Sequence, residues 1–333
     1  MDEPRPATIR TTVAARSPDL QAFAVNKRPL RISREMTVED AYRVTVLECL
    51  AHVASNVGAV TRSRDVEGLH QLRVGLRRLA VAFAAFGDDF RTPALRELQE
   101  RTKTFSSAVA PARDLDVFAE ELLGPPEEAA GDEAFVLLRE RLDRARLEAW
   151  DQTVERVSSV EFAILMDDVA LAAQTRSWAT AAGIDLKSRI AVRAPVKSVA
   201  PRMLDEYLIK ARKRARHVKD LDVGDCHRLR ISLKKLRYAA EFYGPLYKKK
   251  KVRKYVAKIK ELQELLGALN DAAQVRATLS QLTLDESLSA RAQADLCFAS
   301  GIVNGWHCAR AVRLGGKALK RWDKFKHTEP FWA

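Results

Sequence analysis

The residues with the clearest chemical pattern are two basic stretches that resemble each other. The first contains His70, Arg73, Arg77 and Arg78, and the second contains His227, Arg230, Lys234, Lys235 and Arg237. Arginine binds phosphate oxygens with a planar pair of donors, lysine binds them as a point charge, and histidine gains positive charge as the pH falls. These residue types in this arrangement predict a site for a phosphate-rich anion.

Each stretch has the periodicity of an amphipathic helix with its cations away from the apolar side. At about 100° per residue, the apolar side of the first helix holds Leu72, Leu76, Leu79, Phe83 and Phe86. The apolar side of the second holds Leu229, Leu233, Leu236, Ala240 and Tyr243. Cations on neighbouring turns repel one another unless an anion lies across them. A solvated basic surface is the alternative interpretation.

The two stretches belong to a longer internal match. At an offset of 157 residues, Asp65 corresponds to Asp222, His70 to His227 and Gly87 to Gly244. A match of this length indicates an internal duplication. We therefore expect an all-α fold of two four-helix-type bundles, related by a pseudo-twofold axis, with a basic groove or pore between them.

Helical periodicity covers most of the chain after residue 36. We expect helices over 39–60, 65–86, 133–156 and 161–176, another opened by Pro93, and a break at Gly124-Pro125-Pro126. Asp114 and Asp271 are expected to cap helices or pair with arginine rather than act in catalysis. The predicted organisation is a flexible tail over 1–34, a first bundle over 35–190 and a second over 191–333.

Charge and composition constrain the partner. Residues 33–123 contain 12 Lys or Arg against 14 Asp or Glu, a net charge of −2, whereas residues 190–280 contain 23 against 9, a net charge of +14. Such an excess favours an anionic partner. Cys49, Cys226, Cys297 and Cys308 fit reduced thiols rather than disulfides or a zinc site, so we expect a cytoplasmic protein without metal or cofactor. No membrane span or signal peptide is expected.

The segments HQLRVGLRRLAVAFAAFG and HRLRISLKKLRYAAEFYG resemble the signature of the CHAD family, the conserved-histidine α-helical domain. The ending KRWDKFKHTEPFW resembles the last helix of that family, so the resemblance covers about residues 35–333. It implies two four-helix bundles around a basic groove, binding of inorganic polyphosphate and an association with polyphosphate granules. Carried over, the ligand-facing residues are the histidines, arginines and lysines of the two basic stretches.

A second group of cations lies on neighbouring predicted helices. Its members are Arg96, Lys103, Lys210, Arg214, His217, Arg253 and Lys260. Lys210, Arg214 and His217 share one helical face, which either extends the groove or is solvated. Phosphate or sulfate is expected to mimic the polyanion.

Two other functions remain open. Nucleic acid has the same kind of backbone charge, but the basic stretches lack the interleaved aromatics of single-strand binders. A phosphohydrolase needs carboxylates near the phosphates, as in the CYTH domains that often accompany CHAD domains, and no Glu-x-Glu-x-Lys motif occurs in residues 1–34. The sequence therefore predicts a non-enzymatic polyphosphate-binding module that targets or organises other proteins.

Overall fold

The computed structural model is all-helical, as predicted. It describes residues 22–86, 90, 92–131, 133–180, 186–216, 218, 222–284 and 288–333, and within these ranges it contains helices and no named strand. An isolated bridge between Thr37 and Pro195 is the sole β-type pairing in this part of the chain. The internal duplication stays a prediction.

The first group of packed helices consists of α1 (Val38–Thr61), α2 (Val66–Ala85), α3 (Pro93–Ala108) and α7 (Val160–Thr175). The axes of α1 and α2 come close because glycine faces α1 at two positions. A Cβ on Gly68 would lie 2.6 Å from Cβ of Ala59, and one on Gly75 would lie 2.7 Å from Cγ2 of Val53. This tight contact fixes how α2 presents its remaining faces.

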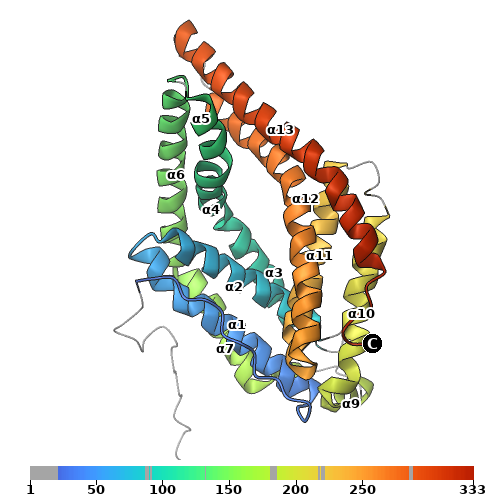
Figure 1. Cartoon of the computed structure of the whole chain (residues 1–333). Coiled ribbons are helices and arrows are strands. Elements are labelled where there is room, and N and C mark those ends of the chain that lie inside the picture. The colour runs from blue at the N-terminus through green and yellow to red at the C-terminus, as the bar shows by residue number, and fades with distance from the viewer. Residues whose placement is uncertain are drawn as a thin grey trace, which may run out of the picture.

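The later helices pack in chain order on the other side of the molecule (Figure 1). After the short α8 (Ser177–Thr180) and α9 (Leu186–Arg193) come α10 (Val196–Ala215), α11 (Val223–Tyr243), a 3-10 turn (Gly244–Leu246), α12 (Lys249–Thr283) and α13 (Ala290–Lys326). α11 also contacts α2, where the Tyr243 hydroxyl donates to the carbonyl of Ala85 at 2.8 Å. The two predicted basic helices are therefore neighbours.

A projecting arm contains α4 (Ala110–Val117), a π-helical segment (Phe118–Leu123), α5 (Gly124–Ala130) and α6 (Phe135–Val157), packed on α13 (Figure 1). The predicted break at Gly124 is wrong, because α5 begins there and its prolines lie in the first turn, where a missing N–H costs no helical bond. Asp114 and Asp271 lie inside α4 and α12, so neither caps a helix.

The hydrophobic core does not follow the predicted boundary at residue 190. The larger cluster combines side chains of α1 and α2 with those of α10, α11 and α12, for example Leu72, Leu204 and Leu236. The smaller cluster joins Leu138 of α6 to Val275 of α12 and Val303 of α13. Both clusters therefore depend on residues from both halves of the sequence.

The predicted flexible tail is wrong for its described part, residues 22–34. Leu30 and Ile32 are buried in the larger cluster. The backbone N–H of Val25 donates to Oδ1 of Asn56 at 2.8 Å, and Nδ2 of Asn56 donates back to the Val25 carbonyl at 2.9 Å. The segment is extended without helical periodicity, and the amide of Asn56 in a core helix satisfies both backbone groups of Val25. Residues 1–21 lie outside the described ranges.

By length and composition, α1 is apolar enough to cross a membrane, contrary to expectation. Its most apolar window has a mean hydropathy of 1.3, but 56% of that window is buried inside the bundle. A helix buried among other helices has the same apolar composition as a membrane span, so burial in the bundle accounts for the composition of α1.

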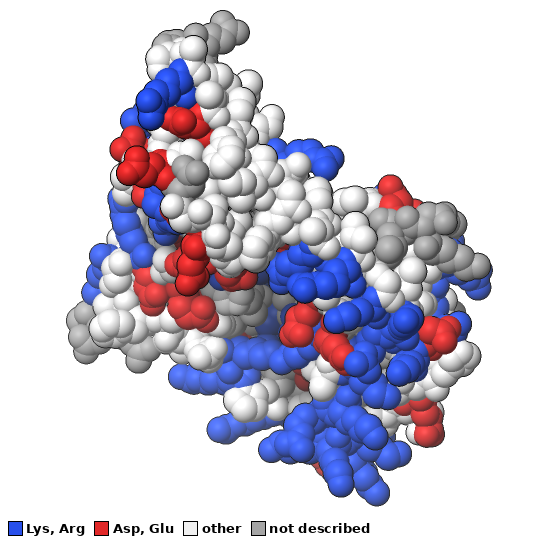
Figure 2. All heavy atoms as spheres, turned by 45° about the horizontal axis from the view of Figure 1, so that its top comes forward, with Lys and Arg blue, Asp and Glu red and all other residues white. Residues whose placement is uncertain are grey.

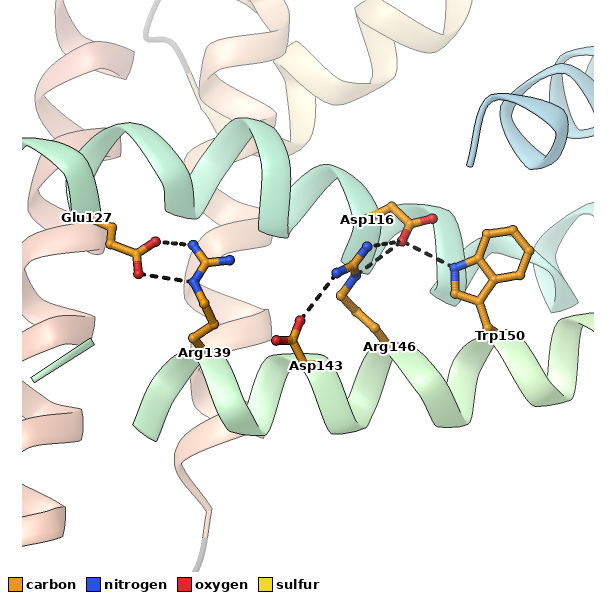
Figure 3. A network of polar contacts seen from close by, with 6 residues as sticks. All are labelled: Asp116, Glu127, Arg139, Asp143, Arg146 and Trp150. Carbon is orange, nitrogen blue, oxygen red and sulfur yellow. Dashed lines mark hydrogen bonds and ion pairs between the residues drawn. The ribbon is translucent and has the colours of Figure 1, made fainter. Parts of the chain in front are cut away.

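The arm is stabilised by a polar network between α4 and α6 (Figure 3). Oδ1 of the fully buried Asp116 accepts hydrogen bonds from Nη2 of Arg146 at 3.0 Å and from Nε1 of Trp150 at 3.2 Å. Nearer the end of the arm, Nε of Arg139 donates to Glu127 at 3.0 Å. A buried carboxylate with a cationic and an indole donor fixes the register of α4 on α6.

Replacing Asp116 with alanine should lower the free energy of unfolding by about 2–4 kcal/mol, because it leaves a guanidinium and an indole N–H without their buried acceptor. Urea denaturation followed by circular dichroism measures this. The control is Arg139→Gln, whose partly exposed ion pair should contribute at most about 1 kcal/mol. Equal effects of the two variants would show that burial of Asp116 does not matter.

Candidate functional site

The predicted amphipathic faces of α2 and α11 are confirmed. The expected apolar residues of both helices are all buried. Asp65 caps α2 by accepting from the N–H of Glu67, and Asp222 caps α11 by accepting from the N–H of Asp225. With one face fixed in the core, each helix turns part of its basic face into the space between them.

Two cavities lie along that space. The first, of about 550 Å³, is lined by α2, α3, α10 and α11, and its cations are Arg73, Arg77, Lys103, Lys210, Lys234 and Lys235. The second, of about 440 Å³, has the cations Lys27, Arg77, Arg230, Lys234, Arg237 and Lys260, and His70 also lines it. Arg77, Lys234 and Tyr238 line both cavities, so we treat them together as the paired cavities. Figure 2 shows one face of the molecule, on which Lys and Arg gather toward the lower right.

Lys234 stands where the two cavities adjoin. Burial, followed by the nearby charges of Arg230, Arg77, Arg237 and Arg73, lowers the pKa of its ammonium group to about 7. Burial also lowers the pKa of Arg77 and that of Arg230, but an arginine stays charged at neutral pH. The site therefore holds crowded guanidinium groups around a lysine that is easily neutralised.

The two histidines have different surroundings. His70 is half-buried and lines the second cavity, and burial lowers the pKa of its imidazole. His227 is exposed, with Nδ1 lying 2.6 Å from Oδ1 of Asn270, and it lines neither cavity. His70 and His227 therefore match in sequence but have different surroundings in the structure.

Acidic residues engage part of the predicted basic stripe. Nη1 of Arg73 donates to Oδ1 of Asp114 at 2.9 Å and to the Ala110 carbonyl at 2.8 Å. Nη1 of Arg237 donates to Oε1 of Glu241 at 3.0 Å. The expected alternative role of Asp114, pairing with an arginine, is confirmed.

Arg78 is the one residue of the first stretch that faces elsewhere. It is buried, lies 3.6 Å from the carboxylate of Glu241 and stacks over the ring of Phe242 at 5.5 Å from the centroid. Its position on the helical wheel, about 100° beyond Arg77, points it toward the α2–α11 contact. We therefore remove Arg78 from the candidate site and assign it to packing between these helices.

The secondary candidates divide in the same way. Lys103 and Lys210 line the first cavity and Lys260 lines the second. Burial lowers the pKa of Lys235, and the charges of Lys103, Lys210 and Arg214 add to that effect, but Arg214 lines neither cavity. Arg96 and Arg253 are exposed and line neither cavity. His217 lies outside the described residues.

Sequence reasoning missed three charged residues: Lys27 and Glu264 line the second cavity, and Glu241 pairs with Lys27 beside it. Lys27, from the extended segment 22–34, forms an ion pair with Glu241 at 2.5 Å, and burial lowers the pKa of its ammonium group. Glu241 could have been found from its spacing, four residues after Arg237 on the same helix. Lys27 gave no signal, because an extended segment held by backbone hydrogen bonds has no helical period.

Comparison with known proteins identifies the family of the chain. Residues 45–280 match the family model of the CHAD domain. The chain belongs to the CHAD domain family. No curated protein matches this CHAD chain.

Two solved structures share the fold. The crystal structure of the CHAD domain from the plant Ricinus communis superposes with a TM-score of 0.76 at 24% sequence identity, covering 93% of this chain and 98% of that one. PptA from Streptomyces chartreusis gives a TM-score of 0.59 at 16% identity, covering 86% of this chain and 100% of that one. At these identities the likeness establishes the fold of this CHAD chain.

The lowered pKa of Lys234 predicts a pH dependence of stability in the absence of ligand. Because the folded-state pKa, about 7, is below the unfolded value, the unfolded chain binds more protons above pH 7. Lys234 therefore destabilises the fold most below pH 7, and this effect fades as the pH rises toward 10. Lys234→Met should raise the melting temperature at pH 6 more than at pH 9, as measured by calorimetry. The control, Lys249→Met on the exposed start of α12, should show no such pH-dependent difference.

Proposed function

We propose that this CHAD chain binds a linear polyanion, inorganic polyphosphate by preference, in the paired cavities. The supporting observation is the crowding of Arg77, Arg230 and Lys234. Ion pairs beside the cavities engage Arg73, Arg78 and Arg237, but within the described residues none engages these three. Cations this close favour an anion with several charges and many acceptor oxygens over a single carboxylate.

The lining favours phosphate units over nucleic-acid bases. Proteins that bind single strands offer exposed aromatic faces on which bases stack. The aromatic residues of the paired cavities are Tyr207 and Tyr238, which are both buried. The Tyr207 hydroxyl donates to the Ala84 carbonyl, and the guanidinium of Arg237 lies 4.7 Å from the Tyr238 ring centroid. The paired cavities thus offer a ligand positive charge but little exposed aromatic surface on which a base could stack.

The proposal includes a binding role without catalysis. Phosphoryl transfer assisted by a metal needs carboxylates that are free to hold the ion. Asp114 is engaged by Arg73, and Glu241 by Lys27 and Arg237. Glu264, which also lines the second cavity, is a single carboxylate. Within the described ranges no group of three or more His, Cys, Asp or Glu is placed to hold a metal ion. A module that brings other proteins to cytoplasmic polyphosphate granules fits this chemistry best.

Neutralising the centre of the site should weaken binding strongly. We expect Arg77→Gln with Lys234→Gln to raise the Kd for polyphosphate at least about tenfold, because two charged contacts contribute on the order of 1.4 kcal/mol or more. Fluorescence anisotropy with labelled polyphosphate measures this, and circular dichroism checks that helix content is retained. The control is Lys249→Gln with Lys250→Gln, which removes two cations from the exposed start of α12. Equal losses in both variants would contradict the assignment.

Competition separates the two polyanion classes. Polyphosphate, single-stranded DNA and RNA would compete for the wild-type chain at physiological salt, with concentrations matched by phosphate. If DNA or RNA displaced half of the labelled polyphosphate at a lower phosphate concentration than unlabelled polyphosphate does, the nucleic-acid alternative would be favoured.

Polyphosphate binding should weaken as the pH rises from 6 to 9. Lys234 is neutral in much of the free protein above pH 7, and it must take up a proton to contact a phosphate. Lys234→Arg keeps its charge across this range and should bind with a smaller pH dependence. Isothermal titration in buffers of different ionisation enthalpy counts the protons taken up. An identical pH profile for the wild type and Lys234→Arg would show that Lys234 does not contact the ligand.

A further inference from the structure

The second half of α13 is strongly basic, unlike its first half. Residues 309–326 contain seven Lys or Arg and one Asp, whereas residues 290–308 contain one Arg and one Asp. Arg313, Lys317, Lys320 and Lys324 are spaced by four, three and four residues, which places them on one face of the helix. All four are exposed. We call these four residues the α13 stripe.

The acids around the α13 stripe are engaged by other cations. Glu261 of α12 forms an ion pair with Arg321, and Asp323 forms one with Lys326. Within the described part of the chain, no ion pair joins a residue of the stripe to an acid. Cations near a helix C-terminus favour its dipole, but that effect is confined to the last turn and does not account for Arg313, Lys317 or Lys320.

The α13 stripe borders a shallow cavity beside the proposed site. This cavity, of about 230 Å³, is lined by Lys317, Lys320, Lys324 and Arg321 of α13, with Glu261 and Leu265 of α12. On the same stretch of α12, Lys260 and Glu264 line the second of the paired cavities. Residues 260 and 264 are neighbours of 261 and 265 on the helix, so the two cavities lie on adjoining faces of α12.

We propose that a long polyanion bound in the paired cavities crosses α12 beside Lys260 and continues along the α13 stripe. This inference rests on the proposed function. The stripe covers twelve residues, so its first and last residues lie about 16 Å apart along the helix, and it offers phosphate units a second row of cations. A chain already held in the paired cavities meets this row at high local concentration, so it adds affinity. A short chain fills the paired cavities alone, so the protein selects for chain length.

Removing charge from the stripe should act on long chains only. The variant carries Lys317→Gln, Lys320→Gln and Lys324→Gln, and its Kd is measured for long-chain polyphosphate and for tripolyphosphate. We expect about a tenfold or greater rise in Kd for the long chain and no change for tripolyphosphate. The slope of log Kd against log salt for the long chain should fall by about 2, because three phosphate contacts are lost.

The matched control carries Arg62→Gln, Arg144→Gln and Arg156→Gln, three exposed arginines of the first half of the chain. It removes the same net charge and should leave both affinities near wild type. An equal loss in the control, or an unchanged long-chain Kd in the stripe variant, would overturn the α13 path while leaving the paired cavities in place. Failure of the wild type to bind either ligand would instead refute the proposed function.

Discussion

The mutual repulsion of cations between α2 and α11 is the constraint around which this site is built. Repulsion is tolerated because the opposite faces of both helices are packed into the larger hydrophobic cluster, for instance through Leu76 and Leu233. Burial of such side chains contributes about 1.5–3 kcal/mol each, so a few of them offset the repulsion of neighbouring charges. The core thus holds the cations in position before any anion arrives.

Glu241 limits this repulsion without neutralising the site. Its carboxylate lies within ion-pair distance of Lys27, Arg78 and Arg237, and their charges keep the pKa of Glu241 low although burial acts in the opposite direction. One negative charge shared among three positive ones still leaves an excess. The same carboxylate joins segment 22–34 to α11. The positions of Lys27 and Arg237, which both line the second cavity, therefore depend on Glu241.

Much of the fold could be predicted, because periodicity reports burial directly. The apolar spacing in residues 65–86 gave α2, and the caps Asp65 and Asp222 follow from ordinary helix chemistry. The position of Asp114 inside a helix and the helical backbone at Gly124 could not be predicted locally. Asp114 lies inside α4 because that helix begins at Ala110, and its side chain reaches Arg73 from another helix. The helix through Gly124 is supported by its packing against α13. Such tertiary contacts are not visible in a sequence window.

The candidate site was predictable in its residue types but not in its asymmetry. Matched positions share side-chain chemistry, yet Arg73 makes a direct ion pair with Asp114, whereas Asp271 lies 3.8 Å from Arg310 of α13 and acts on Arg230 only through its field. The helices α12 and α13 are 35 and 37 residues long, against 16 for both α3 and α7, so they place partners around the second stretch that the first stretch does not have. The residues around the second stretch therefore come from the longer and more basic helices α12 and α13. This explains why Arg230 has no direct ion-pair partner among the described residues, whereas Arg73 has one.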